Sequence, residues 1–592
     1  MTPGRKWIFW IAGALLLAIV ASVVVTLNRG GHYPIYKASS FSNLALPNSN
    51  VASSGDPTVQ IGAGTLRGTA AGSAIAFRGI PYAQPPVGEL RWQPPRPAVA
   101  WVGVQDASRP GNACTQRASG LTPFFAPMAK AYDAKFEQPP ITSSEDCLYL
   151  DVWVPEWPVK RALPVMVWLH GGSNRVGSGT QSTYDGASLA RRGVLVVTLN
   201  YRLGAMGFLS FPELTAESPH RSSGNYGLLD QLAALKWVKL NISEFGGDPD
   251  NVTLFGESAG AIDATRLMTS PLAAGLFKRV ISESGPAFDT GLTLSRAEAF
   301  GSAVSSLAPG GPSTPLEKLR AMPAGDVETL VAKAAEHLPT DITAATVDGW
   351  VLPMSPQQAF LTGAIQKVDL LIGLNGRELS AFRLSAAAAG ASSGGPGSVG
   401  GSPGLKQFSD AAHPYFGRWT NLAIAGYLGR ILLYKTAGTD AAVNDLIGAC
   451  PVGAVASLTN AGGNRVFVYR FDRSIPGKGE AELGAFHSLE VPYVFGSLRD
   501  KEWQWLPTTA DDASLSDLMQ TYWTNFAKTG NPNGAGLPDW PAWSDDKSEF
   551  LLIQRDASVT KQRNFPPLFS SLGAEELKAS FKATASGAKS AP

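Results

Sequence analysis

Histidine and cysteine are scarce in this chain, with 6 and 3 copies among 592 residues. Their spacing matches no zinc-binding pattern, so we expect no metal site. Neither sign of charge dominates, because 49 Lys and Arg residues face 48 Asp and Glu residues, which leaves a net charge of +1. Without a block of basic residues, nothing indicates a nucleic-acid partner. The 44% of hydrophobic residues is ordinary for a globular protein with a large core.

Long apolar runs are also rare, and the notable one lies near the start of the chain. Residues 7–27 carry no charge and follow Arg5 and Lys6. A helix needs about 20 apolar residues to span a bilayer, and this run is long enough. A cleaved signal peptide usually has a shorter apolar region of roughly 7–15 residues, and Ile19-Val-Ala21 is a mediocre cleavage site. We therefore favour an uncleaved signal anchor over residues 1–28, with a cleaved signal peptide as the alternative.

Either interpretation predicts export. An anchored protein would face outward on the periplasmic side, attached to the membrane, whereas a cleaved one would be secreted or periplasmic. Residues 29–57 are rich in Ser, Asn, Gly and Pro and are predicted to be a linker. The cysteines Cys114, Cys147 and Cys450 allow one disulfide in an oxidising compartment.

Beyond residue 58, short apolar runs alternate with a helical pattern. Residues 163–169 and 193–199 are almost continuously apolar, which is typical of strands buried on both faces of a parallel sheet. Apolar residues recur at helical spacing over 225–245, and Gly246-Gly247 ends that pattern. The alternation predicts an α/β fold with a mainly parallel sheet. Further strands are expected at 252–255, 279–282, 368–373 and 465–471.

We expect one catalytic domain over residues 58–572. Residues 385–404 are almost wholly Ala, Gly, Ser and Pro, which predicts a flexible surface insertion. The small, polar residues 573–592 are expected to form a frayed tail. The sequence does not indicate an oligomeric state.

The most informative motif is Gly256-Glu-Ser-Ala-Gly260, which follows the apolar run 252–255. A strand that runs into Gly-x-Ser-x-Gly and then a helix is the pattern of a nucleophile elbow, a sharp turn that exposes the serine hydroxyl. Ser258 is therefore the candidate nucleophile. The glycines are expected because side chains there would collide with the neighbouring strand or helix.

A serine nucleophile needs a base and an acid that orients the base. Of the six histidines, His487 is the candidate base, because it lies late in the chain in a loop that leads into an apolar segment. The acid should follow a strand between the serine and this histidine. Glu378 meets that requirement, and Asp348 is the alternative, with Glu378 favoured by about two to one on position alone. The backbone N–H groups of Ala259 and of the loop His170-Gly-Gly-Ser173 are candidate donors to an oxyanion.

Several blocks of this sequence together resemble the type-B carboxylesterases, a family of α/β-hydrolases. The resemblance covers residues 58–555 and implies an α/β-hydrolase fold with the catalytic loops at the carboxyl ends of the strands. The matching blocks are Ala76-Phe-Arg-Gly-Ile-Pro-Tyr-Ala-Gln-Pro-Pro-Val-Gly-Glu-Leu-Arg-Trp92, Ser144-Glu-Asp-Cys-Leu-Tyr-Leu-Asp-Val152, Phe245–Gly260 and Tyr522-Trp-Thr-Asn-Phe-Ala-Lys-Thr-Gly-Asn-Pro-Asn533.

The resemblance implies a role for each matching residue. It implies a serine esterase that acts on a small-molecule ester through an acyl-enzyme, without metal or organic cofactor. An inactive adhesion or scaffold protein, or an amidase or lactonase with the same residues, is the alternative. The implied roles are nucleophile for Ser258, acid for Glu378 in preference to Asp348, base for His487, oxyanion donors for Gly172, Ser173 and Ala259, and a disulfide between Cys114 and Cys147.

The chain departs from the family pattern in two places. The glycine loop, usually Gly-Gly-Gly-Phe or Gly-Gly-Ala-Phe, is here Gly171-Gly-Ser-Asn-Arg175. We hypothesise that Arg175 pairs with a carboxylate on the acyl group, the alternative being a solvent-facing arginine. Residues 115–146 contain no tryptophan, which argues against a choline-ester specialist, because those enzymes stack a tryptophan there on the cation.

Overall fold

The structure is a computed structural model of the chain. It describes residues 33–41, 57–139, 141–311, 315–389, 444–563 and 565. The predicted membrane anchor at 1–28 and the predicted tail at 573–592 lie outside the described residues, as does most of the predicted insertion at 385–404. No helix in the part of the chain that the structure describes is long and apolar enough to cross a bilayer.

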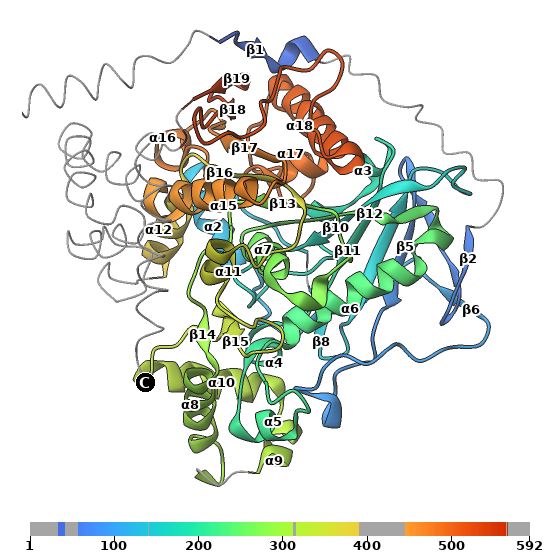
Figure 1. Cartoon of the computed structure of the whole chain (residues 1–592), viewed down its shortest axis with the longest axis vertical. Helices are drawn as coiled ribbons and strands as arrows, with labels where there is room; N and C mark the ends of the chain where they lie inside the picture. Colours follow the sequence, from blue (N-terminus) through green and yellow to red (C-terminus); the bar gives the residue numbers. More distant parts are fainter. Residues whose placement is uncertain are drawn as a thin grey trace, which may run out of the picture.

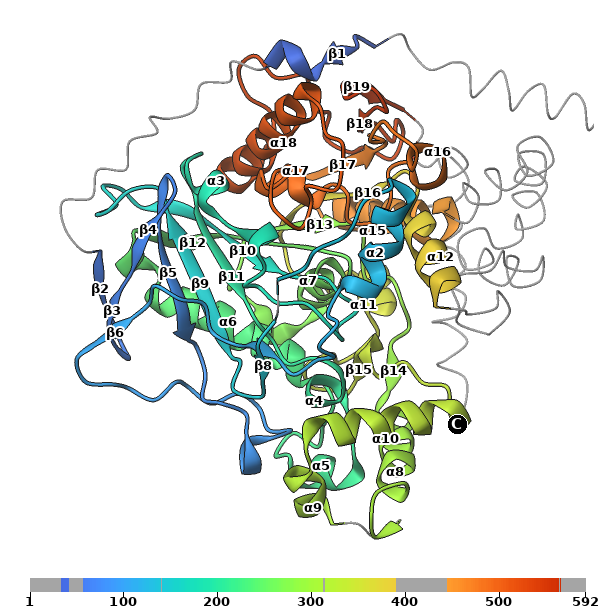
Figure 2. The same ribbon diagram turned by 180° about the vertical axis from the view of Figure 1, so that it is seen from behind.

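A large sheet forms the centre of the molecule (Figures 1 and 2). From β11 to β18 each strand pairs in parallel with its neighbour, whereas the strands at both edges are antiparallel. This arrangement confirms the predicted α/β fold. In spatial order the strands are β1 (Tyr36–Lys37), β19 (Ser558–Gln562), β18 (Phe550–Ile553), β17 (Val466–Phe471), β16 (Asp369–Asn375), β13 (Arg279–Glu283), β12 (Gly247–Glu257), β10 (Leu163–Leu169), β11 (Leu195–Leu199), β9 (Tyr149–Val154), β5 (Ala74–Pro81) and β4 (Thr69–Ala71).

Helices cover both faces of this sheet. One face packs against α6 (Tyr226–Asn241), α7 (Ala259–Thr269), α11 (Pro356–Thr362) and α15 (Cys450–Ala461). The other face packs against α2 (Thr122–Ala131), α3 (Ala187–Ala190), α17 (Val491–Phe495) and α18 (Ala510–Thr529). At one end of the molecule lie α5 (Pro212–Glu217), α8 (Leu294–Ser306), α9 (Leu316–Ala321) and α10 (Ala324–His337) (Figure 2).

The remaining elements are short. They are the helices α4 (Gly204–Phe208), α12 (Glu378–Ala388) and α16 (Glu480–Leu483), the small sheet of β2 (Thr58–Ile61), β3 (Gly64–Arg67) and β6 (Val104–Asp106), and the strand pairs β7 (Ala113–Cys114) with β8 (Ser143–Ser144) and β14 (Leu292–Thr293) with β15 (Thr346–Val347).

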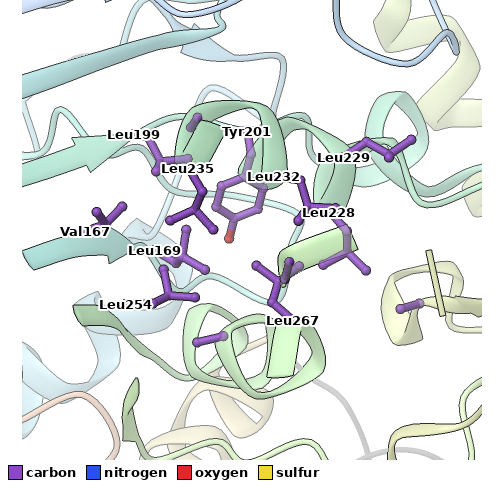
Figure 3. Close-up of a cluster of buried hydrophobic side chains, with 14 of the residues drawn as sticks. Val167, Leu169, Leu199, Tyr201, Leu228, Leu229, Leu232, Leu235, Leu254 and Leu267 are labelled. Carbon is purple, nitrogen blue, oxygen red and sulfur yellow. The ribbon is translucent and has the colours of Figure 1, made fainter. Parts of the chain in front are cut away.

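The core follows from the alternation of side chains along each strand. In β10, Val165, Val167 and Leu169 point into one hydrophobic cluster, and Met166 and Trp168 point into the cluster on the opposite face. Successive residues of a strand point to opposite faces. The strand is therefore apolar throughout because both faces are covered by helices. Figure 3 shows part of the first cluster, in which strand residues meet side chains of α6 and α7: Val167, Leu169, Leu199 and Leu254 with Leu228, Leu232, Leu235 and Leu267.

Two segments differ from the predicted boundaries. Part of the predicted linker is a strand, because Tyr36 and Lys37 of β1 pair with Val559 and Ser558 at the edge of the sheet. Helix α12 extends to Ala388, so the first residues of the predicted flexible insertion are helical. Alanine-rich sequence favours helix once a neighbouring turn has formed, and composition alone therefore placed the start of the insertion too early.

Candidate active site

The serine of the predicted elbow lies on a strained turn. Strand β12 ends at Glu257 and helix α7 begins at Ala259, and Ser258 between them has φ 54° and ψ −123°. A positive φ is costly for a residue with a side chain, and such strain is typical of functional sites. The flanking glycines have no room for side chains, because a Cβ on Gly256 would lie 2.6 Å from the carbonyl carbon of Gly260.

The structure joins His487 to Glu378. His487 Nδ1 lies 2.5 Å from Glu378 Oε2, and both residues are buried. Glu378 follows β16, and its Oε1 accepts the backbone N–H of Asn375 at 2.7 Å. A backbone bridge between Arg377 and Phe486 holds the loop after β16 against the histidine loop. The carboxylate is therefore fixed at one nitrogen of the imidazole.

Asp348, the alternative acid, accepts hydrogen bonds from the backbone of its own turn. Its Oδ1 accepts the backbone N–H groups of Trp350 and Leu352, each at 3.0 Å. An aspartate that accepts backbone donors two and four residues later stabilises the local turn. Of the two candidate acids, Glu378 is the one in contact with the histidine.

Glu257 is the unexpected member of the site. His487 Nε2 lies 3.2 Å from Glu257 Oε1, and Ser488 Oγ donates to the same oxygen at 2.6 Å. Burial by itself lowers the pKa of His487, but the charges of Glu257 and Glu378 outweigh it and raise this pKa to about 9. The imidazolium is thus held between two carboxylates. The sequence signal for this role was the position of Glu257 directly before Ser258.

A third buried glutamate, Glu490, lies close to Glu257 and Glu378. Glu490 Oε1 accepts the hydroxyl of Ser284 at 2.7 Å, and Asn375 Nδ2 donates to Glu490 Oε2. Burial and the negative charges of Glu257 and Glu378 raise the pKa of Glu490 to about 8. Glu490 therefore favours its neutral form at neutral pH. Burial also raises the pKa of Glu257, against the lowering effects of the His487 charge and the Ser488 hydrogen bond.

The candidate oxyanion loop is held by an unusual asparagine. Gly172, Ser173 and Asn174 have φ values of 109°, 57° and 54°. Asn174 is buried, donates from Nδ2 to Asp263 Oδ1 at 3.2 Å and accepts the hydroxyl of Tyr201 at 3.0 Å. Asparagine tolerates this backbone region better than most residues. The side-chain hydrogen bonds of Asn174 thus hold the backbone of this loop in place.

A cavity of about 610 Å³ opens above the serine. Ser258, His487, Glu257, Gly172 and Ser173 line it, and Ala259 is the first residue of α7 below it. Its size suits a drug-sized molecule. The remaining wall combines polar residues, among them Arg117, Arg175, Glu328 and Glu502, with an apolar and aromatic part formed by Leu121, Phe124, Phe125, Phe136, Val176, Tyr184, Phe382, Val491 and Trp503.

Part of this wall belongs to a disulfide-closed loop. Cys114 and Cys147 form a disulfide, whereas Cys450 is free and buried. The loop that they close contributes several rings to the cavity, and Phe125 packs edge-on against Trp503 with centroids 5.2 Å apart. No sequence pattern indicated Trp503, because it lies far from this loop along the chain and only the fold brings the two together.

The chain is similar to known esterases over most of its length. The model of the carboxylesterase family matches residues 55–566. A para-nitrobenzyl esterase of Bacillus subtilis is 34% identical over 511 residues, which cover 84% of this chain and 94% of that protein. A fumonisin B1 esterase of Sphingopyxis macrogoltabida is 36% identical over 487 residues, with 79% and 82% covered.

The solved structures agree with these relatives. A thermophilic PNB esterase superposes with a TM-score of 0.71 at 33% sequence identity, covering 88% of this chain and all of that one. A carboxylesterase of Geobacillus stearothermophilus superposes with a TM-score of 0.69 at 32% identity, covering 86% and 98%. The shared architecture is the predicted α/β-hydrolase fold. The chain therefore belongs to the carboxylesterase family and is a carboxylic ester hydrolase.

Proposed function

We propose that this enzyme hydrolyses esters through a Ser258–His487–Glu378 triad and an acyl-enzyme. The observation that carries the proposal is the 2.5 Å contact between His487 and Glu378, at the cavity that contains the strained Ser258. A carboxylate at Nδ1 fixes the tautomer of the imidazole and stabilises its charged form. Nε2, which lies 3.2 Å from Glu257 Oε1 in this structure, is then the nitrogen that exchanges a proton with Ser258 during the reaction. The remaining cavity accommodates the ester.

The reaction then follows from the positions of these groups. His487 Nε2 removes the hydroxyl proton as Ser258 Oγ bonds to the ester carbonyl carbon. The carbonyl oxygen becomes an oxyanion, held by the backbone N–H groups of Gly172, Ser173 and Ala259. The carbon–oxygen bond to the alcohol breaks, and the alcohol leaves with the proton from His487. Water repeats both steps on the acyl-enzyme, which releases the acid and restores the serine.

We also propose that the enzyme works in an exported, oxidising compartment. The disulfide between Cys114 and Cys147 supports this location, because such bonds persist outside reducing cytosol. Attachment to a membrane through residues 1–28 stays a prediction, to be checked by fractionation of the full-length protein.

Covalent labelling tests the nucleophile directly. A fluorophosphonate is expected to modify the enzyme once and to abolish hydrolysis of p-nitrophenyl esters, because the activated hydroxyl attacks phosphorus as it would a carbonyl. Mass spectrometry of peptides should place the adduct on Ser258. Ser302, an exposed serine of α8, serves as the internal control and should stay unmodified. An adduct on another serine, or full activity after labelling, would contradict the proposal.

The pH profile provides a second prediction. Hydrolysis needs neutral His487, and Glu257 and Glu378 raise its pKa to about 9. We therefore expect kcat/KM to rise with pH through a midpoint above the ordinary histidine value of about 6.5. In Glu257→Gln the largest raising charge is gone, so the midpoint should move down by about 1–3 pH units.

Stopped-flow or initial-rate profiles from acidic to alkaline pH measure this shift. Glu244→Gln, which removes an exposed carboxylate beyond α6, is the matched control and should keep the wild-type midpoint. An unchanged midpoint in Glu257→Gln would show that Glu257 does not act on the imidazole.

A further inference from the structure

Two arginines line the cavity, and the proposed reaction uses neither. Arg175 follows Ser173 by two residues, and its backbone N–H donates to Gly172 O at 3.0 Å. Its guanidinium therefore extends from the same turn that presents the oxyanion donors. Arg117 lies in the disulfide-closed loop and also borders the cavity. Each arginine brings a planar set of donors that matches a carboxylate.

The two arginine loops are tied together. Gln116 Nε2 donates to Gly177 O at 2.7 Å, and Gly177 N–H donates back to Gln116 Oε1 at 2.9 Å. Arg117 directly follows Gln116, and Arg175 lies two residues before Gly177. Among the described residues Arg117 has no ion-pair partner, and its Nε donates only to Gly120 O, at 3.4 Å. Its charge is thus available to a ligand.

Arg175 pairs with Asp341, and a ligand carboxylate could take the place of this aspartate. Its Nη2 lies 2.8 Å from Asp341 Oδ1, with 45% and 64% of the two side chains exposed. Exposed ion pairs of this kind contribute little to stability, so a ligand carboxylate can replace Asp341 at small cost. Asp341 keeps its bonds from Thr343 N–H and Oγ1 when Arg175 leaves.

Other acidic residues of the cavity have hydrogen-bond donors of their own. Glu328 accepts the backbone N–H of Ala205 at 2.7 Å; burial raises its pKa, while that hydrogen bond and the nearby charge of Arg175 lower it. Glu502 is buried beneath the aromatic wall, where the hydroxyl of Thr183 donates to it. Glu257 faces His487. Each of these carboxylates already has donors, whereas the two guanidinium groups retain free ones.

The position of His487 determines which half of the ester, the alcohol or the acyl group, lies near the arginines. The alcohol oxygen must lie at His487 Nε2, which protonates it. The rings of Phe382 and Phe124 flank this imidazole, with centroids 4.8 and 6.2 Å from it. The alcohol half therefore occupies this aromatic side. The acyl half is left with the side formed by the oxyanion loop and α10, where Arg175 lies.

We propose that Arg175, assisted by Arg117, forms a subsite for a carboxylate on the acyl group. The preferred substrates are then esters of dicarboxylic or polycarboxylic acids that keep one free carboxylate. This inference rests on the proposed triad. On this proposal, the unusual Gly-Gly-Ser-Asn-Arg loop determines substrate specificity. Asn174 holds its backbone in place, and Arg175 binds the carboxylate of the acyl group.

A matched pair of substrates tests the subsite. Benzyl hydrogen glutarate carries a carboxylate where benzyl 5-methylhexanoate carries an isopropyl group of the same shape, and benzyl alcohol is measured for both. The readout is the ratio of kcat/KM for the acidic ester to that for the neutral ester. In Arg175→Ala this ratio should fall by about tenfold or more, mainly through a higher KM for the acidic ester.

Further variants separate charge from geometry. Arg175→Lys should retain part of the preference, Arg117→Ala should lose a smaller share, and Asp341→Asn should raise the ratio because it frees Arg175. Arg320→Ala, which breaks a pair with Glu217 away from the cavity, should leave the ratio unchanged. An unchanged ratio in Arg175→Ala, or an equal loss for both esters, overturns the subsite. Wild-type rates in Ser258→Ala would instead overturn the triad.

Discussion

Replacing Ser258 with alanine is expected to lower kcat for any ester by roughly 10⁴–10⁶-fold. The variant loses the atom that bonds to the substrate, and His487 then has no hydroxyl to activate. The oxyanion donors and the cavity remain, so a small residual rate above that of water is expected. Initial rates with p-nitrophenyl acetate and butyrate measure the loss.

The fold should survive this change. Alanine removes only the hydroxyl from a side chain that lines the cavity, and the backbone N–H of Ser258 still donates to Glu283 O at 2.9 Å. We expect an unchanged melting temperature, which shows that lost activity reflects chemistry. Ser302→Ala on the exposed face of α8 is the control and should retain full activity. Activity of Ser258→Ala within tenfold of the wild type would exclude Ser258 as the nucleophile.

Replacing Arg202 with methionine is expected to lower the free energy of unfolding by about 3–5 kcal/mol. Arg202 follows β11 and makes a two-pronged ion pair with Asp230 of α6, at 2.8 and 2.7 Å, with 3% and 0% of the side chains exposed. The backbone N–H of Arg202 also donates to Asp230. Removing the guanidinium leaves a carboxylate buried without its counter-charge, which is the main cost.

Two comparisons make this prediction specific. Lys239→Met breaks an ion pair with Asp250 whose side chains are 37% and 71% exposed, and it should lower the stability far less than Arg202→Met does. The double variant Arg202→Met with Asp230→Leu should recover much of the lost stability, because no unpaired charge remains. Urea unfolding followed by tryptophan fluorescence measures all three. Equal losses in Arg202→Met and Lys239→Met would show that burial of the pair does not matter.

Local patterns predicted the fold well because its strands are buried on both faces. The run 163–169 matches β10 residue for residue, and the left-handed Gly246 directly follows the short 3₁₀ turn Ile242–Phe245 that continues α6. The strand at 252–255 proved longer at its start, since β12 begins at Gly247. Polar residues such as Asp248 gave no apolar signal there, and pairing with a neighbouring strand decided the boundary.

Contacts between distant segments were harder to predict. Position and resemblance favoured Glu378 over Asp348, and the structure places Glu378 against His487. The approach of Glu257 to Nε2 of the same histidine was harder to predict, because it depends on how the loop that carries His487 returns to the end of β12. The same holds for Arg117 and Trp503, which enter the cavity wall from separate loops. Sequence periodicity indicates which residues of one helix or strand are buried. It does not indicate which distant segments come into contact.

The pairing of β1 with β19 has a practical consequence for production of the enzyme. Tyr36 and Lys37 occupy the hydrogen-bonding edge of β19, and Tyr33 adds a bond to Glu549 at 3.0 Å. A shortened version that starts at the family match, at residue 55, would uncover this edge. Uncovered edge strands recruit strands from other molecules and promote aggregation. Soluble versions made without the apolar segment should therefore begin before Tyr33, so that the chain itself blocks that edge.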